Sequence, residues 1–210
     1  TYRPVKDDTL IFEARRYFEK HNKDLEKTTL AHFYSGAVYR DKNHYDKAMQ
    51  AYKDAATTAQ KTNDPDLKGM VQYNIGDLLL QDNLIEEALD AYKKAEQLYG
   101  QSSKNAEEKQ IKCLSAVGRM FLMLSKPDST FFYLHKGLEL AEETENIELQ
   151  SHLMQNLSIA YREAKEYDKA EDLLSQSFLL NNDSAEEVRY YLNFANLYSL
   201  MGENDSVTVY

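Results

Sequence analysis

The chain has 210 residues and a formal net charge of −10, and this length suits one domain or one short array of repeats. Its seven glycines and three prolines are too few turn residues for an all-β protein, and the excess of 35 acidic over 25 basic residues argues against general binding to nucleic acid or to anionic membrane. One cysteine, Cys113, excludes an internal disulfide and a cysteine-rich zinc site, and no apolar run approaches the roughly 18–20 residues that span a bilayer.

Helices are expected along the whole chain, because apolar residues recur at helical spacing and no alternating strand pattern extends over a useful length. The residues Leu84, Ala88, Tyr92 and Ala95 show this spacing. In chain order, the predicted helices cover residues 8–21, 25–41, 45–61, 66–82, 85–99, 104–125, 128–144, 147–164, 168–180 and 184–201.

Helix start signals agree with several of these boundaries. Asp64-Pro65 precedes one predicted helix, and a proline in the first turn costs no hydrogen bond. Residues 126–129 read Lys-Pro-Asp-Ser and predict a turn followed by a new helix. Asp183-Ser184 and the acidic pair that follows them supply an N-cap and favourable charge at the start of the last helix.

An internal repeat organises these helices. Tyr39-Arg40 followed by residues 45–48 (Tyr-Asp-Lys-Ala) recurs as Tyr161-Arg162 followed by residues 167–170, an offset of 122 residues. Intermediate copies divide this offset, and a small residue begins each copy at steps of 40, 42, 40 and 37 residues: Gly36, Gly76, Gly118, Ser158 and Ala195. In each copy a bulky residue follows three positions later, and in most copies a small residue follows after twelve.

This pattern resembles the tetratricopeptide repeat (TPR), a helix–turn–helix unit with small and large residues at fixed positions. The resemblance covers about residues 10–210, although His32 and Gln72 stand where the family usually has an aromatic residue, and the proline that usually ends the unit is missing. It implies an all-α protein: a right-handed superhelical solenoid of antiparallel helix pairs, with about 4.5–5 repeats.

A single domain is expected over residues 1–210, because no Pro-, Gly- or Ser-rich linker divides the chain. In this domain, residues 8–21 form a half repeat or a capping helix, four repeats cover 25–61, 66–99, 104–144 and 147–180, and 184–210 form a truncated repeat. Because a solenoid normally ends in a polar cap, we expect the native protein to continue past Tyr210 or to have lost its tail. The single cysteine suits the cytoplasm and leaves a bacterial periplasm open.

No catalytic or cofactor motif is present in the sequence. It contains no GxGxxG, P-loop, HExxH or EF-hand pattern, and its five histidines lack metal-ligand spacing. Cys113 lies in an apolar stretch with no histidine nearby in sequence, which favours a buried thiol over a nucleophile, and His32 is expected to pack in the interior. The chain is therefore predicted to be non-catalytic, with no cofactor or metal.

The resemblance also implies a concave peptide-binding groove along the first helices of the pairs. When the small residue of each unit is numbered eight, TPR proteins direct positions 2, 5, 6, 9, 12 and 13 into this groove. The full set here includes Ser115, His152, Gln155 and Ile159. The nine candidate binding residues selected from it are Tyr34, Tyr73, Asn74, Lys112, Arg119, Asn156, Arg162, Arg189 and Asn193.

Two features of the groove set indicate the chemistry of a ligand. Asparagine recurs at position six, as Asn74, Asn156 and Asn193, and its side chain can donate to and accept from a peptide backbone at once. The set also holds five basic residues against three acidic ones, on a chain that is acidic as a whole. A weakly basic groove favours a peptide that bears carboxylates.

These observations predict a non-catalytic protein–protein interaction scaffold that binds a peptide or a partner helix in the groove. A second interpretation stays open: a ligand-sensing TPR segment of a larger bacterial signalling or transcription regulator, suggested by the truncated last repeat. Fold alone does not decide between them. The sequence does not specify the partner, the compartment or the oligomeric state.

Overall fold

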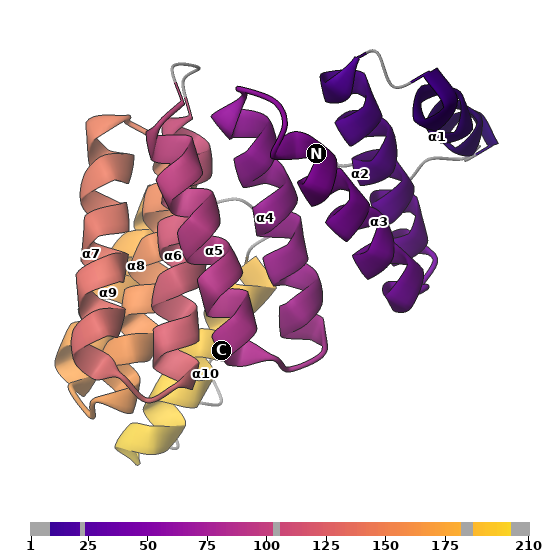
Figure 1. Ribbon diagram of the computed structural model, residues 1–210. Coiled ribbons are helices and arrows are strands. Elements are labelled where there is room, and N and C mark those ends of the chain that lie inside the picture. Colours follow the sequence, from indigo (N-terminus) through magenta and orange to yellow (C-terminus); the bar gives the residue numbers. More distant parts are fainter. Residues whose placement is uncertain (1–8, 22–23, 103–105, 182–186, 203–210) are drawn as a thin grey trace. The chain divides into compact units, whose positions relative to one another are not determined.

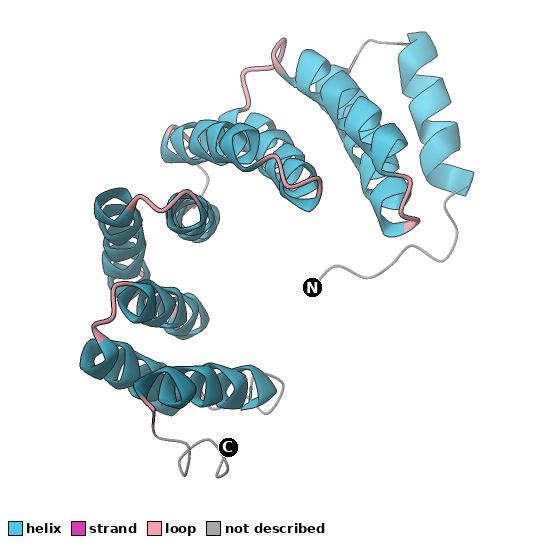
Figure 2. Ribbon diagram, turned by 90° about the horizontal axis from the view of Figure 1, so that it is seen from below, coloured by secondary structure: helices cyan, strands magenta, loops and turns pink. Residues whose placement is uncertain are grey.

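The structure is a computed structural model that describes residues 9–21, 24–102, 106–181 and 187–202. Helices and short connections make up these residues, and no strand occurs among them (Figures 1 and 2). The helices are α1 (Thr9–His21), α2 (Leu25–Asp41), α3 (Tyr45–Ala59), α4 (Pro65–Gln81), α5 (Ile85–Gly100), α6 (Glu107–Met123), α7 (Pro127–Glu143), α8 (Ile147–Glu163), α9 (Tyr167–Leu180) and α10 (Glu187–Met201). The all-α prediction is confirmed.

The chain divides into two compact units between Ala106 and Glu107. In unit 1, the pairs α2–α3 and α4–α5 pack together through α3 and α4, and α1 lies against α2. In unit 2, the pairs α6–α7 and α8–α9 pack through α7 and α8, and α10 lies against α9. The helix pairs follow the predicted repeats within a few residues, while the single continuous domain stays a prediction.

Several predicted helix starts are confirmed. Asp64 caps α4 by accepting hydrogen bonds from the backbone of Asp66 and Leu67 at 3.0 and 3.1 Å, and Pro65 is the first helical residue. Helix α7 begins at Pro127, as the Lys-Pro-Asp-Ser turn predicts. The expected N-cap at Asp183-Ser184 lies outside the described residues.

Tight contacts inside each pair explain the small residue at position eight. A Cβ on Gly36 would lie 2.6 Å from the Tyr52 ring, and a Cβ on Gly76 would lie 2.8 Å from Cε1 of Tyr92. In the fourth pair, Ser158 takes this position, and its hydroxyl donates to the Ala170 carbonyl at 2.7 Å. The small residue therefore lets the two helices of a pair approach closely around a large side chain of the second helix.

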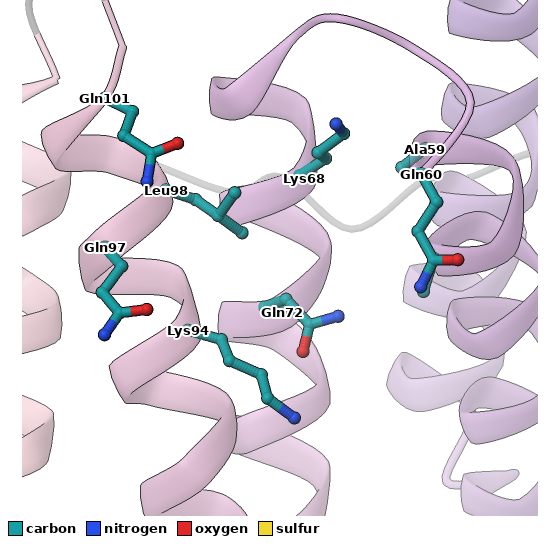
Figure 3. A pocket seen from close by; sticks show the side chains of 9 residues that line it. Ala59, Gln60, Lys68, Gln72, Lys94, Gln97, Leu98 and Gln101 are labelled. Carbon is teal, nitrogen blue, oxygen red and sulfur yellow. The ribbon is translucent and has the colours of Figure 1, made fainter.

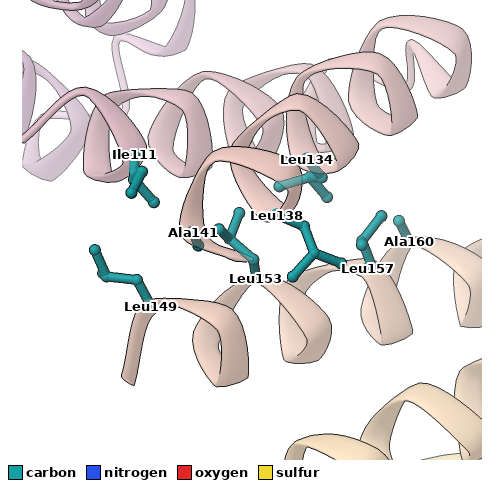
Figure 4. Close-up of a cluster of buried hydrophobic side chains, with 8 residues drawn as sticks. All are labelled: Ile111, Leu134, Leu138, Ala141, Leu149, Leu153, Leu157 and Ala160. Carbon is teal, nitrogen blue, oxygen red and sulfur yellow. The ribbon is translucent and has the colours of Figure 1, made fainter. Parts of the chain in front are cut away.

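Stacking of one pair on the next buries the apolar stripes. In unit 2, Leu134 and Leu138 on α7 meet Leu149, Leu153 and Leu157 on α8 (Figure 4). The Tyr92 hydroxyl, at the edge of a core in unit 1, donates to Asp77 at 2.8 Å. A pair thus completes its core only against its neighbour, as repeat proteins require.

Three-residue turns join the helices within four of the pairs and also join α7 to α8, and a non-glycine residue in the left-handed region stands at the centre of each. These residues are Asn43, Asn83, Ser125, Glu145 and Lys165, with φ between 53° and 63°. After each one, a backbone N–H closes the turn onto the preceding helix, for example from Glu166 to the Tyr161 carbonyl at 2.9 Å. This is a Schellman-type helix end, which satisfies carbonyls that the helix leaves open.

Candidate peptide-binding site

A pocket of about 340 Å³ lies in unit 2 among α6, α8 and α10. All of its lining residues belong to the groove positions transferred from the sequence: Ser115, Arg119, His152, Gln155, Asn156, Ile159, Arg189 and Asn193. Four of the nine selected binding residues, Arg119, Asn156, Arg189 and Asn193, therefore line one pocket. They come from three helices that are far apart in sequence. They meet in one pocket because the first helices of successive pairs present equivalent faces.

The walls of this pocket combine cationic and amide groups. Arg119 on α6 and Arg189 on α10 are exposed, whereas Asn156 and Asn193 are half-buried. The Asn156 amide donates to the Ser115 hydroxyl at 2.9 Å and so links α8 to α6. No carboxylate occurs among the described lining residues. The pocket can thus hold an anionic group between guanidinium and amide donors.

Burial and the nearby positive charges both act on His152. Burial lowers the pKa of its imidazole, the nearby charges of Arg189 and Lys112 lower that pKa further, and Glu148 opposes them. The imidazole is therefore neutral at pH values where an ordinary histidine is already partly protonated. An incoming carboxylate would reverse part of this effect by stabilising the imidazolium.

Lys112 and Arg162 lie outside the residues that line the pocket. Lys112 on α6 forms an ion pair with Glu108, and this hydrogen bond lowers the pKa of the Glu108 carboxyl. The Arg162 guanidinium on α8 donates to Glu163 at 3.0 Å, while its buried Nε has no hydrogen-bond partner in the described part of the chain. Their contact with a ligand stays a prediction.

Unit 1 holds the remaining three candidates. Tyr34 on α2 is 47% exposed, and Tyr73 on α4 packs edge-to-face on Tyr92 with ring centroids 5.2 Å apart. The Asn74 oxygen accepts from Arg40 at 3.0 Å, and its amide donates to the Met70 carbonyl at 2.9 Å. Asn74 on α4 therefore positions Arg40 of α2, a role that the recurrence of asparagine did not indicate.

Residues that sequence reasoning left out of the selected set include His152 and Gln155. Both stand at groove positions, so the repeat register was the signal that could have found them. Gln155 is 4% exposed and its amide lies 3.5 Å from the Ser151 hydroxyl. The described residues contain no group of histidine, cysteine and acidic side chains that could hold a metal ion, and no described helix is long and apolar enough to cross a membrane.

Comparison with known proteins agrees with the repeat pattern. The family model described as tetratricopeptide repeat matches residues 31–62 and 71–102, which cover the first two helix pairs. The chain is a TPR repeat protein. Two curated proteins also match: transcriptional activator NprA of Geobacillus stearothermophilus, 34% identical over 72 residues, and anaphase-promoting complex subunit cut9 of Schizosaccharomyces pombe, 28% identical over 177 residues. The alignments cover 34% and 83% of this TPR chain but 18% and 24% of those proteins.

Solved structures with the same fold include bacterial TPR proteins. BtubC from P. vanneervenii superposes with a TM-score of 0.78 at 17% identity, over 95% of this chain and 83% of BtubC. Aspartyl phosphate phosphatase F from Bacillus subtilis gives 0.76 at 16% identity, over 91% of this chain and 51% of the phosphatase. The Rap conjugation gene regulator of plasmid pLS20, solved with the Phr* peptide, gives 0.72 at 17% identity, over 90% and 53%. At these identities the likeness shows the TPR fold alone.

Proposed function

We propose that this TPR protein is a non-catalytic scaffold that binds a carboxylate-bearing peptide of a partner protein, and that the pocket among α6, α8 and α10 holds the carboxylate. The observation that carries this proposal is the convergence of Arg119, Arg189 and His152 in one pocket without an acidic lining residue. TPR domains bind proteins and peptides, and the structural neighbour from plasmid pLS20 was solved with a peptide.

The amide groups of the pocket favour a peptide over a small anion. Asn156, Asn193 and Gln155 each carry a donor and an acceptor, which match the two groups of a peptide bond. Ile159 adds an apolar contact for a side chain. A bare inorganic anion would accept hydrogen bonds from the arginines and would leave the amide oxygens unmatched.

A comparison of captured proteins tests this function. The full chain, the Arg119→Ala/Arg189→Ala variant and the control Arg16→Ala/Lys53→Ala, whose residues are exposed and lie in unit 1, would each be used as bait in a lysate of the source organism. The two variants remove the same positive charge. We expect a partner that the parent and the control retain and that the pocket variant loses, with unchanged helicity in all three. Equal capture by all three baits would contradict a role for the pocket.

A second candidate is a ligand-sensing segment of a larger regulator. The match to part of a transcriptional activator favours it, because the aligned region is 18% of that protein. The reading frame beyond Tyr210 tests it. A membrane helix, a helix-turn-helix or a kinase-like module there would support this candidate, and a stop codon after one capping helix would contradict it.

A further inference from the structure

A second hollow, of about 270 Å³, lies in unit 1 among α3, α4 and α5 (Figure 3). Lys68 and Gln72 are its residues on α4. At about 3.6 residues per turn, they face the opposite side of α4 from Asn74 and Asp77, which occupy groove positions. The hollow is therefore separate from the first-helix face that carries the candidate groove residues of unit 1.

Small or slender side chains line part of the hollow, and one of them stands where the repeat family usually has bulk. Gln72 occupies the position at which the repeat family usually has an aromatic residue, and α3 contributes Ala56 and Ala59. The same repeat position in the first pair holds His32, which is buried. Leu98 on α5 supplies an apolar wall to the hollow.

The polar side chains around this hollow have no partner among the residues that the structure describes. They are two lysines, Lys68 and Lys94, and four glutamines, Gln60, Gln72, Gln97 and Gln101. Within the described residues, none of these six side chains forms a hydrogen bond or ion pair, and none of the hollow's lining residues is acidic. By contrast, Gln50 and Gln176 donate to neighbouring carboxylates at 2.9 and 2.8 Å.

An adjoining hollow of about 570 Å³ extends this surface. Lys68, Leu98 and Gln101 line both hollows, so the two adjoin each other. The second hollow also includes the carboxylates of Glu26 and Asp64. The surface therefore changes from basic to acidic along its length, with Lys68 at the boundary.

We propose that the hollow among α3, α4 and α5 binds an acidic segment of a partner polypeptide, with its carboxylates at Lys68 and Lys94. Figure 3 shows Gln72 between the ends of the two lysines along α4, where it can meet the backbone of such a segment. Glutamine donates and accepts at once, as a peptide bond does, whereas phosphate carries too few hydroxyl donors to match the oxygens of four glutamines.

The test uses nuclear magnetic resonance on the full chain labelled with ¹⁵N. The probes are acetyl-tetraglutamate amide, its uncharged isostere acetyl-tetraglutamine amide, and inorganic phosphate. The proteins are the parent, Lys68→Gln/Lys94→Gln, and the control Lys53→Gln/Lys61→Gln, which removes two exposed lysines of unit 1 outside the hollow. We expect tetraglutamate alone to shift the side-chain amide signals of Gln60, Gln72, Gln97 and Gln101.

The apparent affinity for tetraglutamate should fall about ten-fold in Lys68→Gln/Lys94→Gln and stay unchanged in the Lys53→Gln/Lys61→Gln control. Equal loss in both variants, or shifts of the same glutamines by tetraglutamine or phosphate, would overturn the proposal. Absence of any shift at these glutamines would also overturn it. Signals of Asn156 and Asn193 report separately on the unit 2 pocket, so failure at one site is distinguishable from failure at the other.

Discussion

His32 is a buried imidazole on α2, at the edge of a charged cluster that includes residues of α1 and α3. Its Nδ1 is 3.7 Å from the Glu19 carboxylate and has no hydrogen-bond partner in the described part of the chain. Arg15 lies between Glu19 and Asp54, at 2.8 and 3.0 Å from their oxygens. Burial lowers the pKa of His32, the Arg15 charge lowers it further, and Glu19 and Asp54 oppose this shift.

The His32 shift predicts that stability falls as the pH drops below about 6.5, the pKa of an unperturbed histidine. Below that pH the unfolded chain binds a proton that the folded protein resists, so the free energy of unfolding decreases until the folded pKa is reached. The slope from one such group is at most about 1.4 kcal/mol per pH unit. Urea unfolding at pH 7.5 and 5.5 should show a smaller difference for His32→Phe than for the parent, and an equal difference would contradict this account.

The helix pair is the element that the sequence predicts best. The small residue at position eight and the Tyr or Leu of the second helix form one contact, and each is readable from the repeat register. The turn conformations could not be predicted from the sequence, because Glu145 and Lys165 are not residue types that favour a positive φ. They adopt it where the chain turns between two packed helices. The hydrogen bond of Asn74 to Arg40 also depends on the distance between α2 and α4, which residue spacing does not give.

At the element scale, we predict that Gly76→Leu destabilises the protein by about 1–3 kcal/mol or more, because its Cβ alone would lie 2.8 Å from the Tyr92 ring. Chemical denaturation followed by circular dichroism measures this loss. The matched control is Gly100→Ala at the exposed end of α5, which should change the free energy of unfolding by no more than about 1 kcal/mol. Unchanged unfolding of Gly76→Leu would show that position 76 is not a close helix contact.

At the scale of the whole molecule, the division between Ala106 and Glu107 was not expected, because no linker composition marks it. The repeat register predicted four of the residues that line the unit 2 pocket: Arg119, Asn156, Arg189 and Asn193. It did not predict the hollow of unit 1. That hollow depends on small residues of α3 and on Leu98 of α5 lying near Gln72 of α4, and their proximity follows from packing between helices. Contacts between helices that are far apart in sequence are therefore what the sequence does not predict.

The two compact units predict that fragments 1–106 and 107–210 fold separately. Repeats are stabilised by their own cores and their immediate neighbours, so each fragment keeps most of its stabilising contacts. Each fragment should give a helical circular dichroism spectrum and a cooperative thermal transition. Two unfolded fragments would contradict this prediction and would support the single continuous domain expected from the sequence.

The most direct test of the central claim is a titration of the ¹⁵N-labelled full chain with acetyl-tetraglutamate amide, read at the side-chain signals of Gln155, Asn156 and Asn193. A carboxylate between Arg119 and Arg189 should shift these signals, whereas the tetraglutamine isostere should not, and the Arg119→Ala/Arg189→Ala variant should lose the effect. Binding should also strengthen as the pH falls toward the lowered pKa of His152, because a bound carboxylate favours the protonated imidazole. Shifts that are equal for both peptides, or that persist in the arginine variant, would contradict carboxylate recognition by this pocket.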